Sequence, residues 1–151
     1  MGKESSEVIR AYLAGFLDAD GAIMATIEKH SEKRFGYRIR VVVKITQKER
    51  TILDWFLSEF QIGRVVINRT TFDWIVKDQN ACYVFLRQIS PYLQVKKQQA
   101  QSAIEILERK IASKVDLVEV AQIADALSRL NVRSKNRRKN TAIMVQEDCL
   151  P

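Results

Sequence analysis

Histidine and cysteine are nearly absent from this chain of 151 residues, which contains only His30, Cys82 and Cys149. A single histidine excludes a histidine-rich zinc site and argues against a catalytic triad that depends on a histidine base. The two cysteines are far apart and lack metal-ligand spacing, so we expect free thiols in a reducing compartment. A hydrolase built from this sequence must therefore use carboxylates, lysines and a hard metal ion.

Glycine, proline and long apolar runs are also scarce. Only 5 glycines and 2 prolines occur, which argues against low-complexity segments and long linkers. No apolar run approaches the ~18 residues of a membrane helix, and the first residues lack the apolar core of a secretion signal. We therefore expect one compact domain, residues 1–151, without a membrane partner, in the cytoplasm or the interior of an organelle.

Positive charge is in excess, with 25 Lys and Arg against 18 Asp and Glu and a pI of about 9.6. Such a balance favours polyanions, which are DNA, RNA or an acidic membrane surface. Most of the excess lies between Glu28 and Arg50, in Lys29, Lys33, Arg34, Arg38, Arg40, Lys44, Lys48 and Arg50. Two interpretations remain open for this segment: a face that binds nucleic acid, and a solvated face of a basic protein.

Hydrophobic periodicity predicts the order helix, hairpin, helix, hairpin and further helices. The predicted helices cover about residues 7–20, 49–60, 81–89, 96–112 and 115–130, and the predicted strands lie near residues 22–28, 38–46, 63–68 and 71–77. Four strands with helices on one side make an α+β layer whose second sheet face must meet water or a ligand. The basic segment after residue 131 and the last eight residues have no predicted element.

The end of the first predicted helix has two unusual features. Ala11, Gly15 and Ala19 lie four residues apart and form a stripe of small residues that allows another backbone to approach closely. Asp18 and Asp20 lie at the C-terminal end of the helix, where the macrodipole disfavours anions. A divalent cation would compensate this charge, and a solvated turn before the following glycine is the alternative interpretation.

The segment from Leu13 to Gly21, LAGFLDADG, resembles the LAGLIDADG motif of a family of homing endonucleases. Over about residues 7–112 the predicted elements resemble that family's αββαββα core, with a four-stranded antiparallel DNA-binding sheet, followed by extra C-terminal helices. A single copy of the motif is similar to the homodimeric branch. The resemblance implies an intron-encoded, site-specific endonuclease that cuts double-stranded DNA at a long, roughly palindromic target. Its implied cofactor is Mg²⁺, with Mn²⁺ or Ca²⁺ as substitutes and no cleavage expected with Ca²⁺.

The resemblance also implies roles for individual residues. Asp20 would bind the catalytic metal together with the backbone carbonyl of Ala19, and Gln47 would organise solvent at the end of the second strand. A catalytic lysine is expected from the segment before the helix at 96–112, where Lys97 ranks ahead of Lys96. A further basic residue shortly after the glutamine would be Lys48 or Arg50.

DNA contacts are expected from the polar sheet face, its turns and the basic tail, since Arg and Lys read guanine in the major groove. The expected contact residues are Met24, Thr26, Glu28, His30, Arg34, Arg38, Arg40, Lys44, Lys48, Arg50, Arg64, Asn68, Asp73, Ile75, Lys77, Lys96, Arg137, Arg138 and Lys139. The expected dimer interface consists of Ala11, Tyr12, Leu13, Gly15, Phe16 and Ala19. An RNA-binding intron maturase and an inactive DNA-binding regulator on the same fold remain alternatives.

Overall fold

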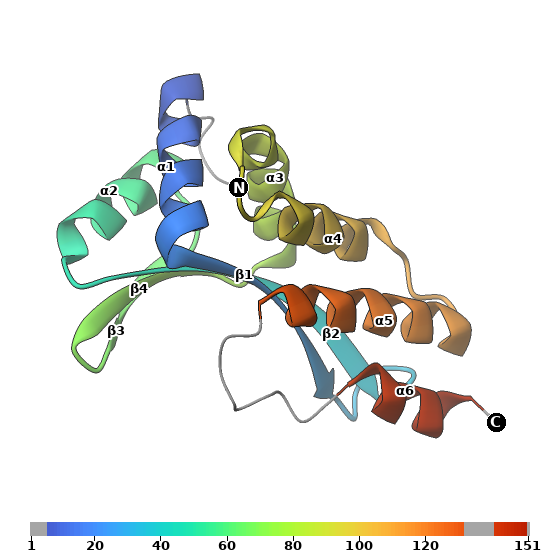
Figure 1. The fold of residues 1–151 in the computed structure, drawn as a ribbon. Helices are drawn as coiled ribbons and strands as arrows, with labels where there is room; N and C mark the ends of the chain where they lie inside the picture. Colours follow the sequence, from blue (N-terminus) through green and yellow to red (C-terminus); the bar gives the residue numbers. More distant parts are fainter. Residues whose placement is uncertain (1–5, 132–140, 151) are drawn as a thin grey trace.

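A computed structural model describes residues 6–131 and 141–150 of the chain. It contains one four-stranded antiparallel sheet in the order β1-β2-β4-β3, and helices cover one face of this sheet (Figure 1). The elements in chain order are α1 (Glu7–Asp20), β1 (Gly21–Lys29), β2 (Tyr37–Gln47), α2 (Arg50–Phe60), β3 (Arg64–Asn68), β4 (Thr71–Val76), α3 (Gln79–Ile89), the short 3-10 helix η1 (Ser90–Tyr92), α4 (Lys97–Glu108), α5 (Lys114–Leu130) and α6 (Ala142–Cys149). The predicted α+β fold is confirmed. None of the helices within the described ranges combines the length and apolar character that crossing a membrane requires.

The first helix passes directly into the first strand. Ser6 caps α1 by accepting a hydrogen bond from the Ile9 amide at 3.3 Å, and Gly21 ends the helix. A Cβ atom at Gly21 would lie only 2.9 Å from the carbonyl oxygen of Leu17, so glycine permits this turn where larger residues would collide. Asp20 is therefore held immediately beside the first residue of β1.

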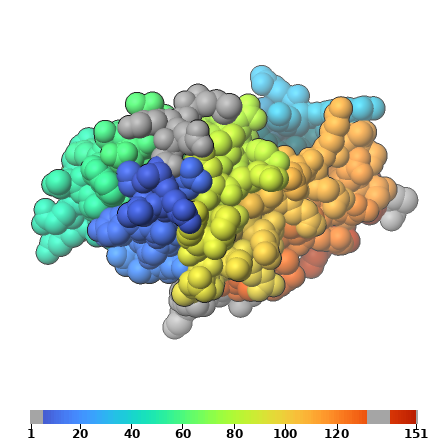
Figure 2. All heavy atoms as spheres, turned by 90° about the horizontal axis from the view of Figure 1, so that it is seen from above, coloured from blue at the N-terminus to red at the C-terminus, as the bar shows by residue number. Residues whose placement is uncertain are grey.

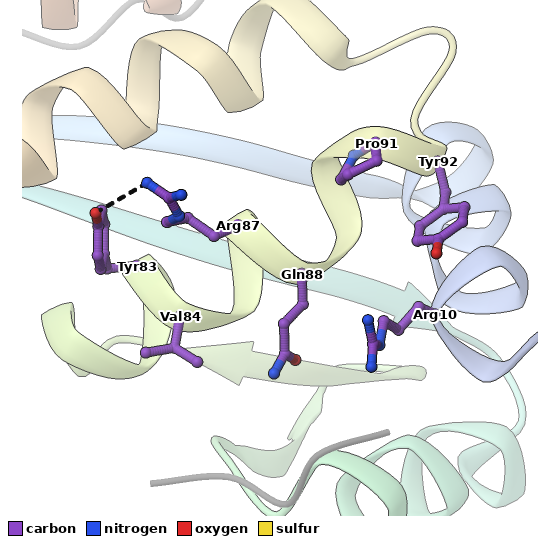
Figure 3. A pocket seen from close by; sticks show the side chains of 7 residues that line it. All are labelled: Arg10, Tyr83, Val84, Arg87, Gln88, Pro91 and Tyr92. Carbon is purple, nitrogen blue, oxygen red and sulfur yellow. Dashed lines mark hydrogen bonds between the residues drawn. The ribbon is translucent and has the colours of Figure 1, made fainter. Parts of the chain in front are cut away.

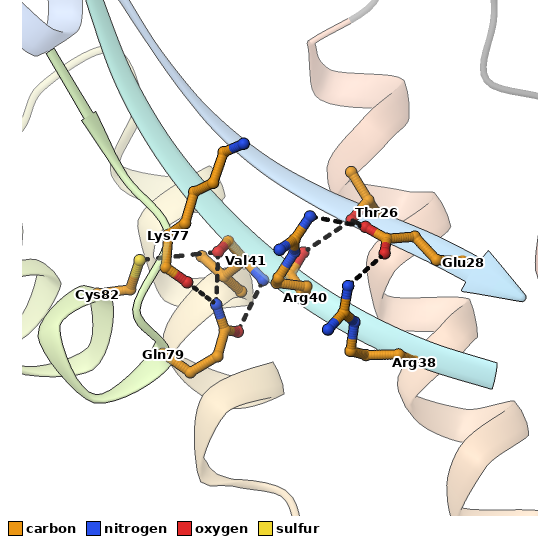
Figure 4. Close-up of polar contacts among 8 residues, drawn as sticks. All are labelled: Thr26, Glu28, Arg38, Arg40, Val41, Lys77, Gln79 and Cys82. Carbon is orange, nitrogen blue, oxygen red and sulfur yellow. Dashed lines mark hydrogen bonds and ion pairs between the residues drawn. The ribbon is translucent and has the colours of Figure 1, made fainter. Parts of the chain in front are cut away.

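Strand β2 is the longest strand and is paired on both sides. It pairs with β1 along the whole length of β1, but β4 leaves it at the pair Val43–Val76. Beyond that point the side-chain amide of Gln79 takes the place of a strand, since it accepts from the Val41 amide at 2.9 Å and donates to the Val41 carbonyl at 2.8 Å (Figure 4). The strand keeps its hydrogen bonds while the chain turns away into α3.

The core lies between the sheet and the helices, as the strand alternation predicted. Ile23, Val43 and Ile45 are fully buried on the helix side of the sheet. Trp74 is also fully buried, and its indole N–H donates to the Ile62 carbonyl at 2.9 Å, so its polar atom is satisfied. Figure 2 shows the helix layer, in which α1 (blue) lies between α2 (green) and α3 with α4 (yellow).

Helix α6 was not predicted from the sequence. Ala142, Val145 and Cys149 are buried on one side of it, and α6 packs against α5. Tyr37 at the start of β2 donates a hydrogen bond to Asp148, which ties α6 to the sheet. Eight residues give a hydrophobic period of only two turns, which is too short to distinguish from chance. The predicted contacts of the basic tail, Arg137, Arg138 and Lys139, fall outside the described residues.

Both cysteines are buried free thiols, as the sequence predicted. Burial raises the pKa of the Cys82 thiol to about 12, so this group stays protonated at neutral pH. Cys82 is fully buried and only the thiolate is reactive, so this thiol lacks the features of a nucleophile.

Candidate active site

The structure brings Asp20 and Gln47 together at the junction of α1 with the sheet. Asp20 is the last residue of α1 and is exposed, and Gln47 is the last residue of β2. The side-chain amide of Gln47 donates to Oδ2 of Asp20 at 2.7 Å. Two residues 27 positions apart in the sequence thus form one polar pair that faces solvent.

Asp18 has a different environment from Asp20. Its carboxylate accepts hydrogen bonds from the backbone amides of Gln94 at 2.8 Å and Lys96 at 2.9 Å. Lys96 is the N-cap of α4, where the helix dipole favours an anion, and Gln94 lies two residues before it. The interpretation that Asp18 needs a divalent cation is therefore wrong, because the N-terminal end of another helix compensates its charge.

Lys96 lies beside the acidic end of α1. It is half-buried, and its Nζ donates to the backbone carbonyl of Asp18 at 2.6 Å. Lys97 is the first residue of α4 and is exposed. The geometry therefore favours Lys96 over Lys97 as the basic residue of the site, which reverses the ranking made from the sequence.

A single protomer offers few ligands for a metal ion. Among the described residues, no three or more His, Cys, Asp and Glu side chains are grouped so that they could hold a metal. The available donors are the exposed Asp20 carboxylate and the nearby backbone carbonyl of Ala19. Mg²⁺ retains several waters and is commonly held by one or two carboxylates together with substrate phosphates. These donors fit such an open site and do not fit a closed structural zinc site.

The small residues of α1 face solvent. A Cβ atom at Gly15 would meet nothing within 4 Å, so this glycine is not required for packing inside the protomer. A shallow hollow follows the exposed side of the helix and is lined by Ala11, Tyr12, Gly15, Phe16, Ala19 and Asp20. Leu13 is fully buried and faces the core, so its predicted place in a dimer interface is wrong.

An exposed tryptophan beside this hollow was not selected from the sequence. Tyr12 is 50% exposed and Trp55 of α2 is 37% exposed, and their rings meet edge to face with centroids 5.8 Å apart. Phe16 packs against Tyr12 on the same side. The sequence contains a sign of this feature. Trp55 lies outside the apolar stripe of its own helix, and a large aromatic residue at such a position indicates an exposed apolar surface.

The polar face of the sheet carries most of the predicted DNA contacts. Met24, Thr26, Lys44 and Ile75 are half-buried, which is typical of a face open on one side. Exposed at its edges and turns are Arg34, Lys48, Arg64, Asn68 and Lys77, and His30 lies half-buried at the end of β1. This arrangement matches the two alternating strand faces that the sequence predicted.

Asp73 is the exception on this face. It is only 5% exposed, and its carboxylate accepts hydrogen bonds from Thr46 at 2.6 Å and from Asn68 at 3.1 Å. The prediction that Asp73 contacts bases is corrected, because its oxygens are covered and already bonded. Thr46, which was not selected from the sequence, belongs to this polar group.

Three charged side chains are linked on the same face. Arg38 and Arg40 of β2 both pair with Glu28 of β1, at 2.8 Å and 3.0 Å (Figure 4). The hydrogen bond from Arg38 lowers the pKa of Glu28 from its ordinary value, while desolvation acts in the opposite direction. Arg50 is also engaged, since it pairs with Asp54 at 3.2 Å.

A second hollow lies on the helix side of the molecule (Figure 3). It is lined by Arg10, Tyr83, Val84, Arg87, Gln88, Pro91 and Tyr92. Arg87 in this hollow bonds to the Tyr83 hydroxyl at 3.2 Å and pairs with Glu108 at 3.4 Å. Arg10 and Asp20 are separated by ten residues of α1, or about 15 Å along the helix, so this hollow is distinct from the acidic end.

Comparison with known protein families gives one matching model, described as LAGLIDADG endonuclease, over residues 13–107. The DNA endonuclease I-CreI of Chlamydomonas reinhardtii is 31% identical over 140 residues, which cover 89% of this chain and 85% of that protein. The DNA endonuclease I-CvuI of Chlorella vulgaris is 30% identical over 128 residues, covering 80% and 78%.

Solved structures of similar fold agree with these sequence matches. The crystal structure of I-CvuI in complex with the I-CreI target has a TM-score of 0.86 at 28% identity and covers 94% of this chain and 92% of that chain. The archaeal intron-encoded homing endonuclease I-Vdi141I, complexed with DNA, has a TM-score of 0.80 at 24% identity and covers 94% of each chain. The second likeness supports the fold alone.

Proposed function

The chain belongs to the LAGLIDADG endonuclease family, and from this premise we propose how it acts as a site-specific DNA endonuclease. Two copies bind a roughly palindromic double-stranded target, and each copy cuts one strand with a divalent metal ion held at Asp20. The hydrogen bond between Asp20 and Gln47 is the observation that carries this proposal. The acid of the motif helix thus lies beside the end of a strand whose alternate residues belong to the polar sheet face.

The site residues divide the work of phosphodiester hydrolysis. The metal ion, when bound, neutralises charge at the phosphate and activates the attacking water. Asp20 would hold that ion together with the Ala19 carbonyl, and Gln47, which donates to the Asp20 carboxylate, would orient solvent through its amide. Lys96 adds a positive charge at the same helix end, where it stabilises charge developing on the leaving oxygen.

Divalent metal use is supported by the relatives and by the donors of this chain. I-CvuI was crystallised with the I-CreI target in the presence of Mg, where the DNA was not cleaved, and with its own target in the presence of Ca. An oxygen-only donor set without histidine suits Mg²⁺, since hard cations prefer carboxylates, carbonyls and water. We propose Mg²⁺ as the working cofactor, with Mn²⁺ as an active substitute and Ca²⁺ as an inactive one.

Two features support a homodimer: each chain has a single motif acid, Asp20, and α1 has an exposed stripe of small residues. One chain contributes one motif and one Asp20, whereas two strands must be cut. The exposed stripe of Ala11, Gly15 and Ala19 ends at Asp20, so packing two copies of α1 about a two-fold axis brings both carboxylates together. Tyr12 and Trp55 would enlarge the apolar contact on either side of the stripe.

Cleavage of DNA in vitro tests the proposed function. The natural substrate is the intronless form of the gene that hosts the coding sequence, incubated with the protein and Mg²⁺. A double-strand break at one position supports the endonuclease, and binding without a break would point to the inactive regulator. Specific binding of the intron transcript without any DNA break would point to the maturase.

The two lysines at the start of α4 give a test of which one is the basic residue of the site, since the geometry favours Lys96 and the sequence favours Lys97. Lys96→Ala should slow cleavage by at least ~10-fold, because it removes a charge beside the acidic end of α1. Lys97→Ala should change the cleavage rate by less than about threefold, since this side chain is exposed and has no hydrogen bond or ion pair among the described residues. Single-turnover cleavage rates at saturating protein measure both effects.

Lys96→Arg is the matched control, since arginine keeps the charge and can still reach the Asp18 carbonyl. Partial recovery of the cleavage rate in this variant would indicate a role of the positive charge. The melting temperature of each variant shows whether the substitution destabilises the fold. A larger loss in Lys97→Ala than in Lys96→Ala would return the basic role to Lys97.

A further inference from the structure

Glu28 occupies an unexpected position for an acid, because it lies on the face that we propose meets the DNA phosphates. Both of its carboxylate oxygens are engaged: Oε2 accepts from Arg38 at 2.8 Å, and Oε1 accepts from Arg40 at 3.0 Å and from the Thr26 hydroxyl at 3.1 Å (Figure 4). The register explains this meeting, since Glu28 stands opposite Arg38 in the pairing of β1 with β2. We call these three residues, Glu28, Arg38 and Arg40, the arginine clamp.

The clamp holds both guanidinium groups against the sheet. The Nε atoms of Arg38 and Arg40 are buried and have no hydrogen-bond partner within the described part of the chain. The side chains themselves remain 35% and 26% exposed, so the covered part is the inner edge of each guanidinium. One Nη2 donor of each arginine goes to Glu28, and neither Nη1 group has a hydrogen-bond partner among residues 6–131 and 141–150. Each arginine therefore presents a fixed outer edge instead of a mobile side chain.

We propose that Glu28 is a positioning residue for target recognition, which fixes Arg38 and Arg40 so that they read two guanines in each half-site instead of binding phosphates. This inference rests on the proposed function, and it adds the chemical feature of the substrate that the polar sheet face selects. Guanine offers O6 and N7 to a guanidinium in the major groove, which is the commonest specific contact of arginine.

The physical reason is that phosphates and bases compete for a long cationic side chain beside DNA. A free arginine is drawn to the nearest phosphate, which carries no sequence information. Ordering such a side chain on binding also lowers affinity. Glu28 reduces both effects. It orders the guanidinium groups before DNA binds, and its negative charge repels a phosphate that approaches the two arginines. Loss of Glu28 should therefore raise affinity for any duplex while it lowers selectivity.

The spacing of the two arginines predicts the spacing of the bases. Arg38 and Arg40 are two residues apart on one face of β2, which corresponds to about 6.6 Å along a strand. Base pairs follow one another at about 3.4 Å along the helix axis and lie farther apart along the groove, so a strand that follows the groove spans one to two steps between these side chains. The two guanine-containing base pairs should be adjacent or separated by one base pair.

The test uses the full chain and selection from a randomised double-stranded DNA library, so that the natural target need not be known. Wild-type protein should enrich a half-site with two such guanines, and Arg38→Ala and Arg40→Ala should each lose one of them. Glu28→Ala, which keeps both arginines, should lose about tenfold preference at both positions and little elsewhere. Its affinity for random-sequence duplex should rise, and its dependence on salt should steepen.

Two further variants keep the result interpretable. Glu28→Gln retains the side-chain length and one acceptor oxygen, so it should lie between wild type and Glu28→Ala, and thermal melting confirms that both variants fold. Glu119→Ala removes an acid of the same charge from another ion pair, with Arg109, in the helix layer. It should leave both the selected sequence and the non-specific affinity unchanged.

Three outcomes would overturn the proposal: an unchanged selection in Glu28→Ala, an equal loss at all positions of the half-site, or a stronger preference for the two guanines. The last result would mean that Glu28 competes with the bases for the arginines. Failure of the proposed function itself looks different, because wild-type protein would then leave every enriched duplex uncut, whatever the effect of Glu28→Ala on the selected sequence.

Discussion

Asp20→Asn protein should bind its target and leave it uncut. Asparagine keeps the size of the side chain and its contact distance to Gln47, but it loses the negative charge that a divalent cation requires. We expect the cleavage rate to fall by at least about 10³-fold, more than the loss that follows removal of one charge stabiliser. Binding should stay equal or tighten, because one negative charge near the phosphates disappears.

Gel-shift titration and a single-turnover cleavage assay on the same DNA measure these two effects. Asp18→Asn is the informative comparison, since its carboxylate holds the start of α4 and is bonded to two backbone amides. That variant should lose thermal stability together with activity, whereas Asp20→Asn should lose activity alone. Cleavage by Asp20→Asn at a rate near wild type would refute the assignment of the metal site.

Gly15→Leu should separate the protein into monomers without damaging the protomer fold. The space around Gly15 is open within 4 Å, and leucine is a better helix former than glycine, so the isolated protomer should gain up to about 1 kcal/mol in stability. In a dimer packed through α1, two added side chains would collide and cost about 1–3 kcal/mol each. Stability and association should therefore change in opposite directions.

Sedimentation at micromolar concentration should show wild type near twice the 17.4 kDa mass of the chain and Gly15→Leu near that mass. Double-strand cleavage should be lost with the dimer, because each protomer supplies one Asp20. Gln101→Leu adds the same side chain at an exposed position of α4 and should remain dimeric and active. A monomeric wild-type protein, or a dimer that tolerates Gly15→Leu, would rule out the proposed two-site mechanism.

The parts of the fold that have a long, regular period could be predicted from the sequence. The bounds of α1 from Glu7 to Asp20 were predicted correctly, because serine and glycine mark its two ends and its apolar residues recur at helical spacing. The strand pair was equally clear, since apolar and polar residues that alternate over many positions fit a strand and do not fit a helix. The family resemblance implied roles for Asp20 in the motif and for Gln47 at the end of the second strand, and these two side chains lie within hydrogen-bonding distance.

Contacts between distant segments could not be predicted in the same way. The sequence shows that Asp18 is an acid at an unfavourable helix end, but it does not show that the amides of residues 94 and 96 lie opposite. It shows that Asp73 is polar on a polar face, but it does not show that Thr46 and Asn68 cover it. Charge and periodicity describe one segment at a time, whereas the role of a polar group depends on what folds against it.

The direct passage from α1 into β1 has a consequence for the geometry of the target. No loop separates α1 from β1 at Gly21, so the proposed dimer surface on α1 and the proposed DNA-binding surface on the sheet are joined directly. In the proposed dimer, the separation and the rotational phase of the two half-sites are then fixed by the protein. One extra base pair at the centre of a target would shift a half-site by about 3.4 Å and turn it by about 35° around the double helix. Binding by such a dimer should therefore depend on the number of base pairs between the half-sites as well as on the bases within them.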